Sequence, residues 1–376
     1  MKIFVEADSI AYEKMSGIGH ATLEILRALD VKLDTDRSLN VTAIIPRNTR
    51  PIVDRYNLKN IRIKEMPIAQ KYINYVLTRT PLPLPIDLWF GRGVYVFPNY
   101  KTWYTPFSRS IMFVHDVAFK IFPDMTNPKN LMYLEANFDR WLSRASAVAT
   151  ITNASATDIR EYFPEVAKKL HVIYLGVSKA QYYRRPKPEI SAAQKKYSLP
   201  NNYFLFVGNL EPRKNIYNLL CAYEAYAANE KNKLPLVLIG GDGWQNKNII
   251  NKIESMVSQG MQVVRPDAYV ADEDLPALYS GAQSVVHWAV HEGFGLPPLQ
   301  AQACGTHVIA SNIPALKEIL DPKTTTFIDP ADIPGMTKSL TRAQSISTAN
   351  ESIKNDISYT WTDTAQGVID LSAMVR

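Results

Sequence analysis

Short apolar runs alternate with helix-like segments along the chain, and this alternation occurs twice. After the first run, the apolar residues between Ile18 and Leu29 recur at the spacing of one helix face. In the first half, the runs that predict strands are Lys2–Glu6, Val41–Pro46, Ile61–Glu65, Val94–Phe97, Ser110–His115, Ser146–Thr152 and His171–Tyr174. In the second half they are Tyr203–Val207, Leu236–Ile239, Gln262–Val264, Ser284–Val290, His307–Ser311 and Thr324–Ile328. Strands that alternate with helices form parallel sheets covered on both faces, so the pattern predicts an α/β fold with two doubly wound sheets.

The length of the chain also favours two domains. Its 376 residues exceed what a single hydrophobic core usually supports. Residues 179–200 are rich in charge, tyrosine and proline, which is typical of a linker. We therefore expect an N-terminal domain over residues 1–178, a linker with a short helix over 179–200, and a C-terminal domain over 201–356. A helical stretch, Thr362–Val375, follows.

The composition is that of a globular protein, with 46% hydrophobic and 21% charged residues. No apolar run approaches the ~18 residues that a membrane-spanning helix needs. The segment Met1–Val5 predicts a strand and lacks the features of a signal peptide. We therefore expect a cytoplasmic protein.

Positive charge is concentrated in residues 47–109, which hold 11 Lys and Arg against three acidic residues, together with many aromatic side chains. Such a face suits an anionic membrane surface or a phosphorylated acceptor. A solvated basic surface over a core of aromatic residues fits the same pattern equally well. Nucleic acid is a weaker candidate, because no recognised binding module is apparent.

The segment 291–305 contains the strongest candidate site. Glu292 and two glycines, Gly293 and Gly295, lie between a predicted strand and a predicted helix. Ligands of open α/β sheets bind at this position, where backbone N–H groups suit a phosphate or a sugar hydroxyl. An ordinary tight turn with a capping glutamate fits the same residue types.

Three further clusters come at strand ends. Arg213 and Lys214 stand at the start of a predicted helix, where cations are locally unfavourable unless they bind an anion such as a diphosphate. Gly17-Ile18-Gly19 is a weak phosphate-loop signal, because the third glycine of a dinucleotide fingerprint is missing. His115, before Asp116, either donates a hydrogen bond to a ligand or is structural.

Taken in order, these motifs resemble those of a large enzyme family. The segments that carry the resemblance are Gly17–His20, His115–Asp116, Ile151–Ser155, Val207–Asn215, Asp272–Ala282, Glu292–Thr306, Ala310–Asn312 and Tyr359–Trp361. They are similar to the motifs of the retaining, nucleotide-sugar-dependent glycosyltransferases of group 1 (family 4), which include bacterial mannosyltransferases. The resemblance covers nearly the whole chain. It implies the GT-B fold, in which two Rossmann-like domains face one another across a cleft. The N-terminal domain would bind the acceptor, the C-terminal domain would bind the donor, and a helix over residues 357–376 would cross back to the first domain.

The resemblance also implies roles for individual residues. Arg213 and Lys214 would neutralise the donor diphosphate, Glu292 would bind the donor sugar, and His115 would contact the transferred sugar or the incoming hydroxyl. Further donor-binding residues would be Gly17, Gly19, Asn209, Tyr269, Val270, Gly293, Phe294, Gly295, Leu296 and Gln300. Neither a metal nor another cofactor would be required.

The function implied is transfer of a hexose, with mannose from GDP-mannose as the leading candidate. The acceptor would be a hydroxyl of a glycan or lipid-linked glycan in bacterial surface polysaccharide synthesis. Contact with the inner face of an anionic membrane would go through the basic, aromatic N-terminal face.

Gln300 departs from the family pattern, which has glutamate at this position to bind both ribose hydroxyls of the donor. An amide offers one acceptor oxygen where a carboxylate offers two, so donor affinity should fall by about 1 kcal/mol. Gln300 leaves open a catalytically silent homologue as one alternative to the active transferase. The other alternative, which does not depend on Gln300, is another GT-B enzyme, such as a nucleotide-sugar epimerase.

Overall fold

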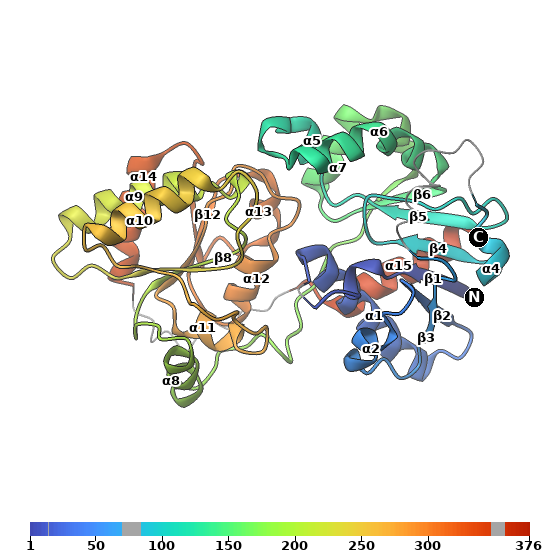
Figure 1. Cartoon of the computed structure of the whole chain (residues 1–376), viewed down its shortest axis with the longest axis horizontal. Helices are drawn as coiled ribbons and strands as arrows, with labels where there is room; N and C mark the ends of the chain where they lie inside the picture. The colour runs from blue at the N-terminus through green and yellow to red at the C-terminus, as the bar shows by residue number, and fades with distance from the viewer. Residues whose placement is uncertain (14, 70–83, 347–357) are drawn as a thin grey trace. The chain divides into compact units, whose positions relative to one another are not determined.

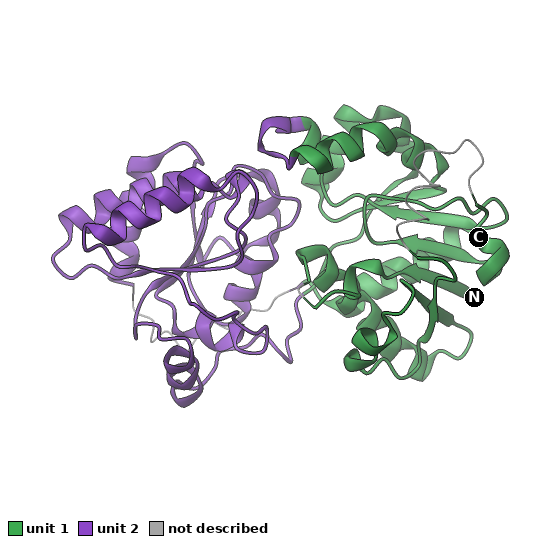
Figure 2. Cartoon of the chain, viewed as in Figure 1, with its two compact units in different colours: residues 1–120, 128–176, 359–376 green, residues 121–127, 177–358 purple. Residues whose placement is uncertain are grey.

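The computed structural model describes residues 1–13, 15–69, 84–346 and 358–376. The chain divides into two compact units (Figure 2). Unit 1 comprises Met1–Lys120, Pro128–Gly176 and Tyr359–Arg376, and unit 2 comprises Ile121–Asn127 and Val177–Ser358. The short segment Ile121–Asn127 thus groups with unit 2, although it lies inside the range predicted for the first domain. The predicted boundary at residues 356 and 357 lies outside the described residues.

Unit 1 is built on a seven-stranded sheet in the order β3-β2-β1-β4-β5-β6-β7, with every neighbouring pair parallel (Figure 1). Its strands are β1 (Lys2–Glu6), β2 (Asn40–Ile45), β3 (Arg62–Glu65), β4 (Val94–Phe97), β5 (Arg109–Phe113), β6 (Ala147–Thr150) and β7 (Leu170–Val172). Its α-helices are α1 (Gly17–Thr35), α2 (Arg50–Val53), α4 (Asp87–Phe90), α5 (Ala118–Ile121), α6 (Pro128–Arg144), α7 (Asn153–Tyr162) and α15 (Trp361–Val375).

The last helix, α15, belongs to the first unit and packs beside α1 (Figure 1). The Thr364 hydroxyl donates to the Tyr174 carbonyl at 2.8 Å. Gly176 permits a close approach, because a Cβ at this position would stand 2.2 Å from the Thr360 carbonyl carbon. The C-terminal helix is therefore an integral layer of unit 1.

Unit 2 has a six-stranded parallel sheet in the order β10-β9-β8-β11-β12-β13. Its strands are β8 (Phe204–Val207), β9 (Leu236–Ile239), β10 (Val263–Val264), β11 (Ser284–His287), β12 (Val308–Ser311) and β13 (Thr325–Ile328). Its α-helices are α8 (Lys187–Lys196), α9 (Ile216–Asn229), α10 (Lys247–Ser258), α11 (Leu275–Gly281), α12 (Leu296–Ala303), α13 (Pro314–Ile319) and α14 (Ile333–Gln344).

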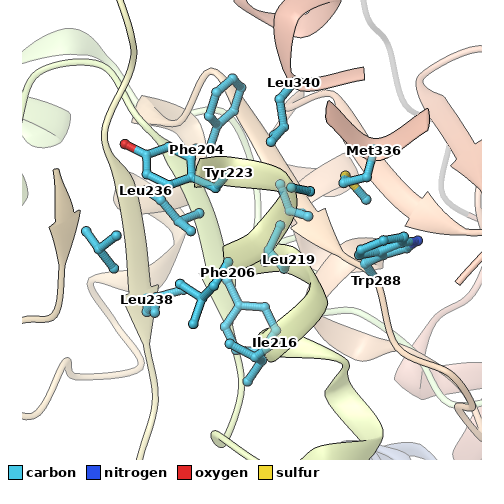
Figure 3. Close-up of a cluster of buried hydrophobic side chains, with 14 of the residues drawn as sticks. Phe204, Phe206, Ile216, Leu219, Tyr223, Leu236, Leu238, Trp288, Met336 and Leu340 are labelled. Atoms are coloured by element: carbon cyan, nitrogen blue, oxygen red, sulfur yellow. The ribbon is translucent and has the colours of Figure 1, made fainter. Parts of the chain in front are cut away.

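The core of unit 2 lies where α9 and α14 cover the sheet (Figure 3). Phe204 and Phe206 project from β8 towards Leu219 and Tyr223 of α9. Full burial of one such side chain contributes roughly 1.5–3 kcal/mol to the free energy of unfolding. Trp288 also belongs to this buried cluster, and its indole N–H donates to the Asp329 carbonyl at 3.0 Å. This core fixes the ends of β8 and β11, from which the candidate site is built.

The predicted α/β fold with two doubly wound sheets is confirmed, and each predicted strand is present. The predicted strand Ser284–Val290 was too long, because β11 ends at His287. Beyond it, the Val290 N–H donates to the Arg213 carbonyl at 2.9 Å instead of joining a neighbouring strand. Among the helices that the structure describes, none is long and apolar enough to span a membrane.

Candidate active site

The candidate site of unit 2 lies at the carboxyl ends of β8 and β11. These two strands are neighbours in the sheet but not in sequence, so the strand order reverses between them. In open α/β sheets, ligands bind in the crevice at such a reversal. Arg213 and Lys214 follow β8 in a short 3-10 helix, Pro212–Lys214, and Glu292 follows β11. Asn215 adopts a left-handed conformation (φ 58°) that ends this turn and begins α9.

Glu292 is the centre of the cluster. Its carboxylate is buried and accepts hydrogen bonds from Lys214 Nζ and from His287 Nε2, the latter at 2.8 Å. Arg213 Nη1 lies 3.5 Å from the second carboxylate oxygen. Three donors therefore fix the orientation of one side chain.

Arg213 is itself held from two sides. Its guanidinium donates to the His291 carbonyl at 2.9 Å and to Glu211 Oε1 at 3.2 Å. The guanidinium thus has a fixed direction before any ligand arrives, and 19% of the side chain remains exposed.

Protonation states follow from burial and charge. Burial alone would raise the pKa of Glu292, but Lys214, Arg213 and His287 outweigh it and hold this pKa well below its usual range. Burial lowers the pKa of His287 despite the adjacent carboxylate. Glu292 is therefore ionised and His287 neutral, with Nε2–H donating to Glu292. The buried His287 Nδ1 has no hydrogen-bond partner among the described residues.

The glycine-containing loop after Glu292 has a backbone conformation that favours glycine, and it leaves little space for a side chain. Gly295 has φ +98°, and a Cβ there would lie 2.4 Å from Leu316 Cδ2. The loop starts α12, whose second and third residues are Pro297 and Pro298. Because proline has no N–H, this helix start offers fewer backbone donors than its position alone suggests. Phe294 is buried and Leu296 is half-buried.

Gln300 lies on α12, and the buried Tyr279 hydroxyl donates to its Oε1 at 3.3 Å. Of two other predicted donor-binding residues, Tyr269 is exposed and Val270 is buried. The Ala271 N–H after them donates to the Tyr197 hydroxyl at 3.0 Å, so the linker helix end anchors this segment. The Asn209 side chain is exposed directly after β8.

Three predicted site residues lie in unit 1. His115 is buried just beyond β5, and its Nε2 is 2.7 Å from the Pro98 carbonyl, to which it donates. Burial lowers the pKa of His115, so the ring is neutral and Nδ1 carries the lone pair. Gly17 and Gly19 lie in the first turn of α1. A Cβ on Gly19 would stand 2.7 Å from the Ser9 carbonyl oxygen, whereas no described atom lies within 4 Å of one on Gly17.

The structure thus brings Arg213, Lys214 and Glu292 together in unit 2. It adds two residues that the sequence motifs did not indicate, His287 and Glu211. His287 had a recognisable signal, because it is a titratable residue inside an otherwise apolar run. Glu211 lay within the Val207–Asn215 motif, but nothing in the motif showed that it holds Arg213. The described residues contain no group of three or more His, Cys, Asp or Glu side chains suited to a metal ion.

Comparison with known proteins identifies the family of unit 2. The model of the family "Glycosyl transferases group 1" matches residues 188–356, which include the whole cluster around Glu292. Unit 2 is a group 1 glycosyl transferase domain. The resemblance drawn from the sequence motifs is therefore confirmed for this domain.

Relatives and solved structures agree with this family. O-antigen chain mannosyltransferase B of Escherichia coli is 32% identical over 60% of this chain and 59% of its own length. The serotype-specific mannosyltransferase WbdA of Escherichia coli is 29% identical over 60% of this chain and 28% of its own length. The chain therefore spans less than two thirds of these relatives.

Solved structures match nearly the whole chain. One is Anabaena Alr3699/HepE in complex with UDP and glucose, with a TM-score of 0.72, 16% identity and 99% coverage of both chains. A sucrose-phosphate synthase from Thermosynechococcus elongatus has a TM-score of 0.71 at 17% identity, covering 100% of this chain and 98% of its own. The two Rossmann-like units together have the GT-B fold.

Proposed function

We propose that this chain is a retaining, metal-independent glycosyltransferase. It transfers a hexose, mannose from GDP-mannose, to a hydroxyl of a glycan or lipid-linked glycan in bacterial surface polysaccharide synthesis. The observation that carries the proposal is the Glu292 carboxylate, held by Lys214, Arg213 and His287 at the strand-order reversal of a group 1 domain.

The two cations suit a diphosphate leaving group. Arg213 and Lys214 are partly exposed and stand side by side, so their charge is available to a phosphate that approaches this edge of the sheet. As the sugar leaves, negative charge builds on the diphosphate, and fixed cations stabilise this charge without reorganising. We therefore expect no divalent metal or other cofactor to be needed.

Glu292 binds the sugar rather than the phosphate. Its ionised oxygens accept hydrogen bonds from sugar hydroxyls, and its three protein donors hold it in one orientation. Neutral His115 accepts a hydroxyl hydrogen bond at Nδ1. The acceptor hydroxyl attacks from the face that the diphosphate leaves, and the diphosphate takes its proton, so the anomeric configuration is retained. The protein then acts through positioning and electrostatics.

The first experiment is a thermal-shift series with GDP-, UDP-, dTDP- and ADP-sugars, without and then with divalent metal. Stabilisation by one nucleotide class without metal supports the proposal and identifies the base. No response to any nucleotide sugar would favour a silent homologue. In an activity assay, conversion of the nucleotide sugar in the absence of an acceptor would instead indicate an epimerase. A product with inverted anomeric configuration would contradict a retaining mechanism.

Lys214→Met should reduce turnover about a hundredfold or more, because it removes one fixed cation. Lys252→Met is the matched control, since Lys252 also pairs with a glutamate, Glu224, at 2.6 Å but lies on α10. Equal losses in the two variants would contradict the proposed role of Lys214.

We also propose that unit 1 contacts an anionic membrane. Leu88, Trp89 and Phe107 are exposed, and the Arg92 guanidinium lies 5.5 Å from the Phe107 ring centroid. Residues 70–83 of the same basic segment lie outside the described residues. Flotation with phosphatidylglycerol vesicles at low salt tests this contact. Absence of binding by the wild-type chain, or binding by Trp89→Ser equal to that of wild type, would contradict the proposed membrane contact.

A further inference from the structure

Unit 1 has a pocket of about 720 Å³ at the edge of its sheet where the strands begin. The first residues of β1 and β5, the loop before β4 and the loop between β4 and β5 line it. The two ends of the chain mark this side of unit 1 (Figure 1). Substrates of open α/β sheets bind at the opposite edge, about 16 Å away along a strand of five residues. The pocket is therefore separate from the edge at which a substrate of unit 1 would bind.

The charge of the pocket is positive. Four cationic side chains line it, those of Lys2, Arg92, Arg109 and Arg376. Among the described residues, no Asp or Glu side chain lines the pocket, and none of the four cations forms an ion pair. Arg50, another surface arginine of unit 1, does form one. Like charges around one space repel one another, and a cleft of one sign of charge attracts counter-ions, so the pocket suits an anion.

The kinds of donor in the pocket favour a phosphate group. Ser108 Oγ accepts from the Gly93 N–H at 3.3 Å, so the hydroxyl proton of Ser108 can be donated to a ligand. The Arg92 guanidinium lies 5.5 Å from the Phe107 ring centroid, and stacking on the ring limits the directions in which its N–H groups point. Guanidinium groups bind phosphate oxygens in pairs, and a phosphate offers more oxygens than a carboxylate.

Exposed apolar side chains beside the pocket indicate the source of the phosphate. Phe107 lines the pocket and is exposed, as are Leu88 and Trp89 of α4. The Asp87 carboxylate accepts from the Phe107 N–H at 2.7 Å, so α4 is held against the same loop. Aromatic residues next to cations are typical of surfaces at the level of lipid headgroups. A free phosphate would leave these side chains in water, whereas a lipid bilayer covers them.

We propose that this pocket binds the phosphate of an anionic lipid headgroup, with Arg92 and Arg109 paired to its oxygens. Phe107 and Trp89 then lie in the interfacial layer of the bilayer. The inference rests on the membrane contact proposed above and identifies its headgroup site. Because the pocket lies where the strands begin, the lipid bound there holds the protein at the membrane and is not a substrate.

The test compares two double variants by flotation with vesicles of phosphatidylcholine and phosphatidylglycerol. Arg92→Gln with Arg109→Gln removes two cations of the pocket. Arg160→Gln with Lys168→Gln is the matched control, because it removes two exposed cations of unit 1 that do not line the pocket. A basic residue at an anionic surface contributes roughly fivefold in affinity, so the pocket variant should bind about thirtyfold more weakly. The control should bind within about twofold of wild type, because charges beyond a Debye length are screened.

Two results would overturn the inference. Equal losses in the two double variants would show that binding depends on net charge alone. Equal binding of the wild-type chain to vesicles of the same surface charge in which oleate replaces phosphatidylglycerol would show that a carboxylate serves as well as a phosphate. If the pocket variant does not fold, as judged by circular dichroism, Lys2→Gln serves in its place, with an expected loss of about fivefold.

Soluble glycerol 1-phosphate distinguishes a lipid headgroup from a free phosphate. It should compete with vesicles for the wild-type chain, and this competition should be lost in the pocket variant. Binding of glycerol 1-phosphate by a chain that does not float with vesicles would overturn the lipid as the occupant. A loss of flotation in Trp89→Ser but not in the pocket variant would keep the membrane contact and reject the headgroup site. None of these measurements requires a nucleotide sugar, so their failure leaves the proposed transferase activity untouched.

Discussion

Replacement of His287 by leucine tests whether the donors around Glu292 matter for function. Leucine has a similar volume but cannot donate the 2.8 Å hydrogen bond from Nε2 to Glu292. A hydrogen bond to a charged group contributes about 1.5–3 kcal/mol, or roughly a 10- to 150-fold change in an equilibrium or rate constant. Because Lys214 and Arg213 still donate to Glu292 in this variant, we expect an effect at the lower end of this range, a loss of about tenfold in kcat/KM for the donor.

Folding stability should respond differently from activity. His287 is almost fully buried, and its Nδ1 has no partner among the described residues. Leucine removes this unsatisfied nitrogen, which offsets much of the lost hydrogen bond, so the unfolding free energy should change by only about 1 kcal/mol. Calorimetric unfolding and steady-state kinetics on the same preparation measure the two quantities.

Two variants serve as controls for this substitution. His287→Gln keeps an N–H donor and should restore most of the activity. His307→Leu removes another histidine of unit 2, just before β12, which bonds to Ser284 at 2.9 Å and Thr326 at 3.1 Å, and should affect stability but not kcat/KM. Folded His287→Leu that keeps kcat/KM within about twofold of wild type would contradict this role of His287, because loss of one charged hydrogen bond has a larger effect.

Three other changes have defined outcomes. Gln300→Glu should tighten donor binding several-fold, about 1 kcal/mol, by titration calorimetry, and unchanged or weaker binding would reject the ribose role. Burial raises the pKa of Glu6 from 4.5 to about 8, so the folded chain favours the protonated carboxyl. Its contribution to the free energy of unfolding is complete below pH 4.5 and is lost as the pH rises to about 8. Denaturant midpoints across this range should decline in wild type and decline less in Glu6→Gln, whereas parallel curves would refute the assignment. Gly240→Ala should cost at least about 2 kcal/mol, because its Cβ would stand 2.0 Å from the Gly208 carbonyl oxygen at φ +146°. Gly260→Ala, with a positive φ but no atom of the described residues within 4 Å, should cost less, and an equal loss would show that backbone strain alone is responsible.

The strands were predictable because buried parallel strands are continuous apolar runs, which stand out from their surroundings. The main error came at Ser284–Val290, where the apolar run continues past the sheet. Nothing in the composition of Trp288–Val290 shows that the Val290 N–H bonds to Arg213 instead of a strand.

The candidate site was predictable where the motif itself carries the chemistry, as for Arg213, Lys214 and Glu292. Ion pairs between distant segments could not be found in this way. In unit 1, Lys101 pairs with Asp8, which lies 93 residues earlier, and the two meet only because β4 pairs with β1. Strand neighbours that are distant in sequence leave no local pattern, so ion pairs across a strand-order reversal are visible only in the folded sheet.

The position of α15 has a consequence for the order in which the chain folds during synthesis. Thr364 meets Tyr174 across 190 residues, and nearly all of unit 2 is encoded between them. Domains fold as their residues emerge from the ribosome, N-terminal parts first. Here unit 2 can complete its sheet while α1 still lacks the helix that covers it. Unit 1, which begins first, is therefore completed after unit 2. A premature stop codon anywhere in unit 2 leaves unit 1 without α15 as well.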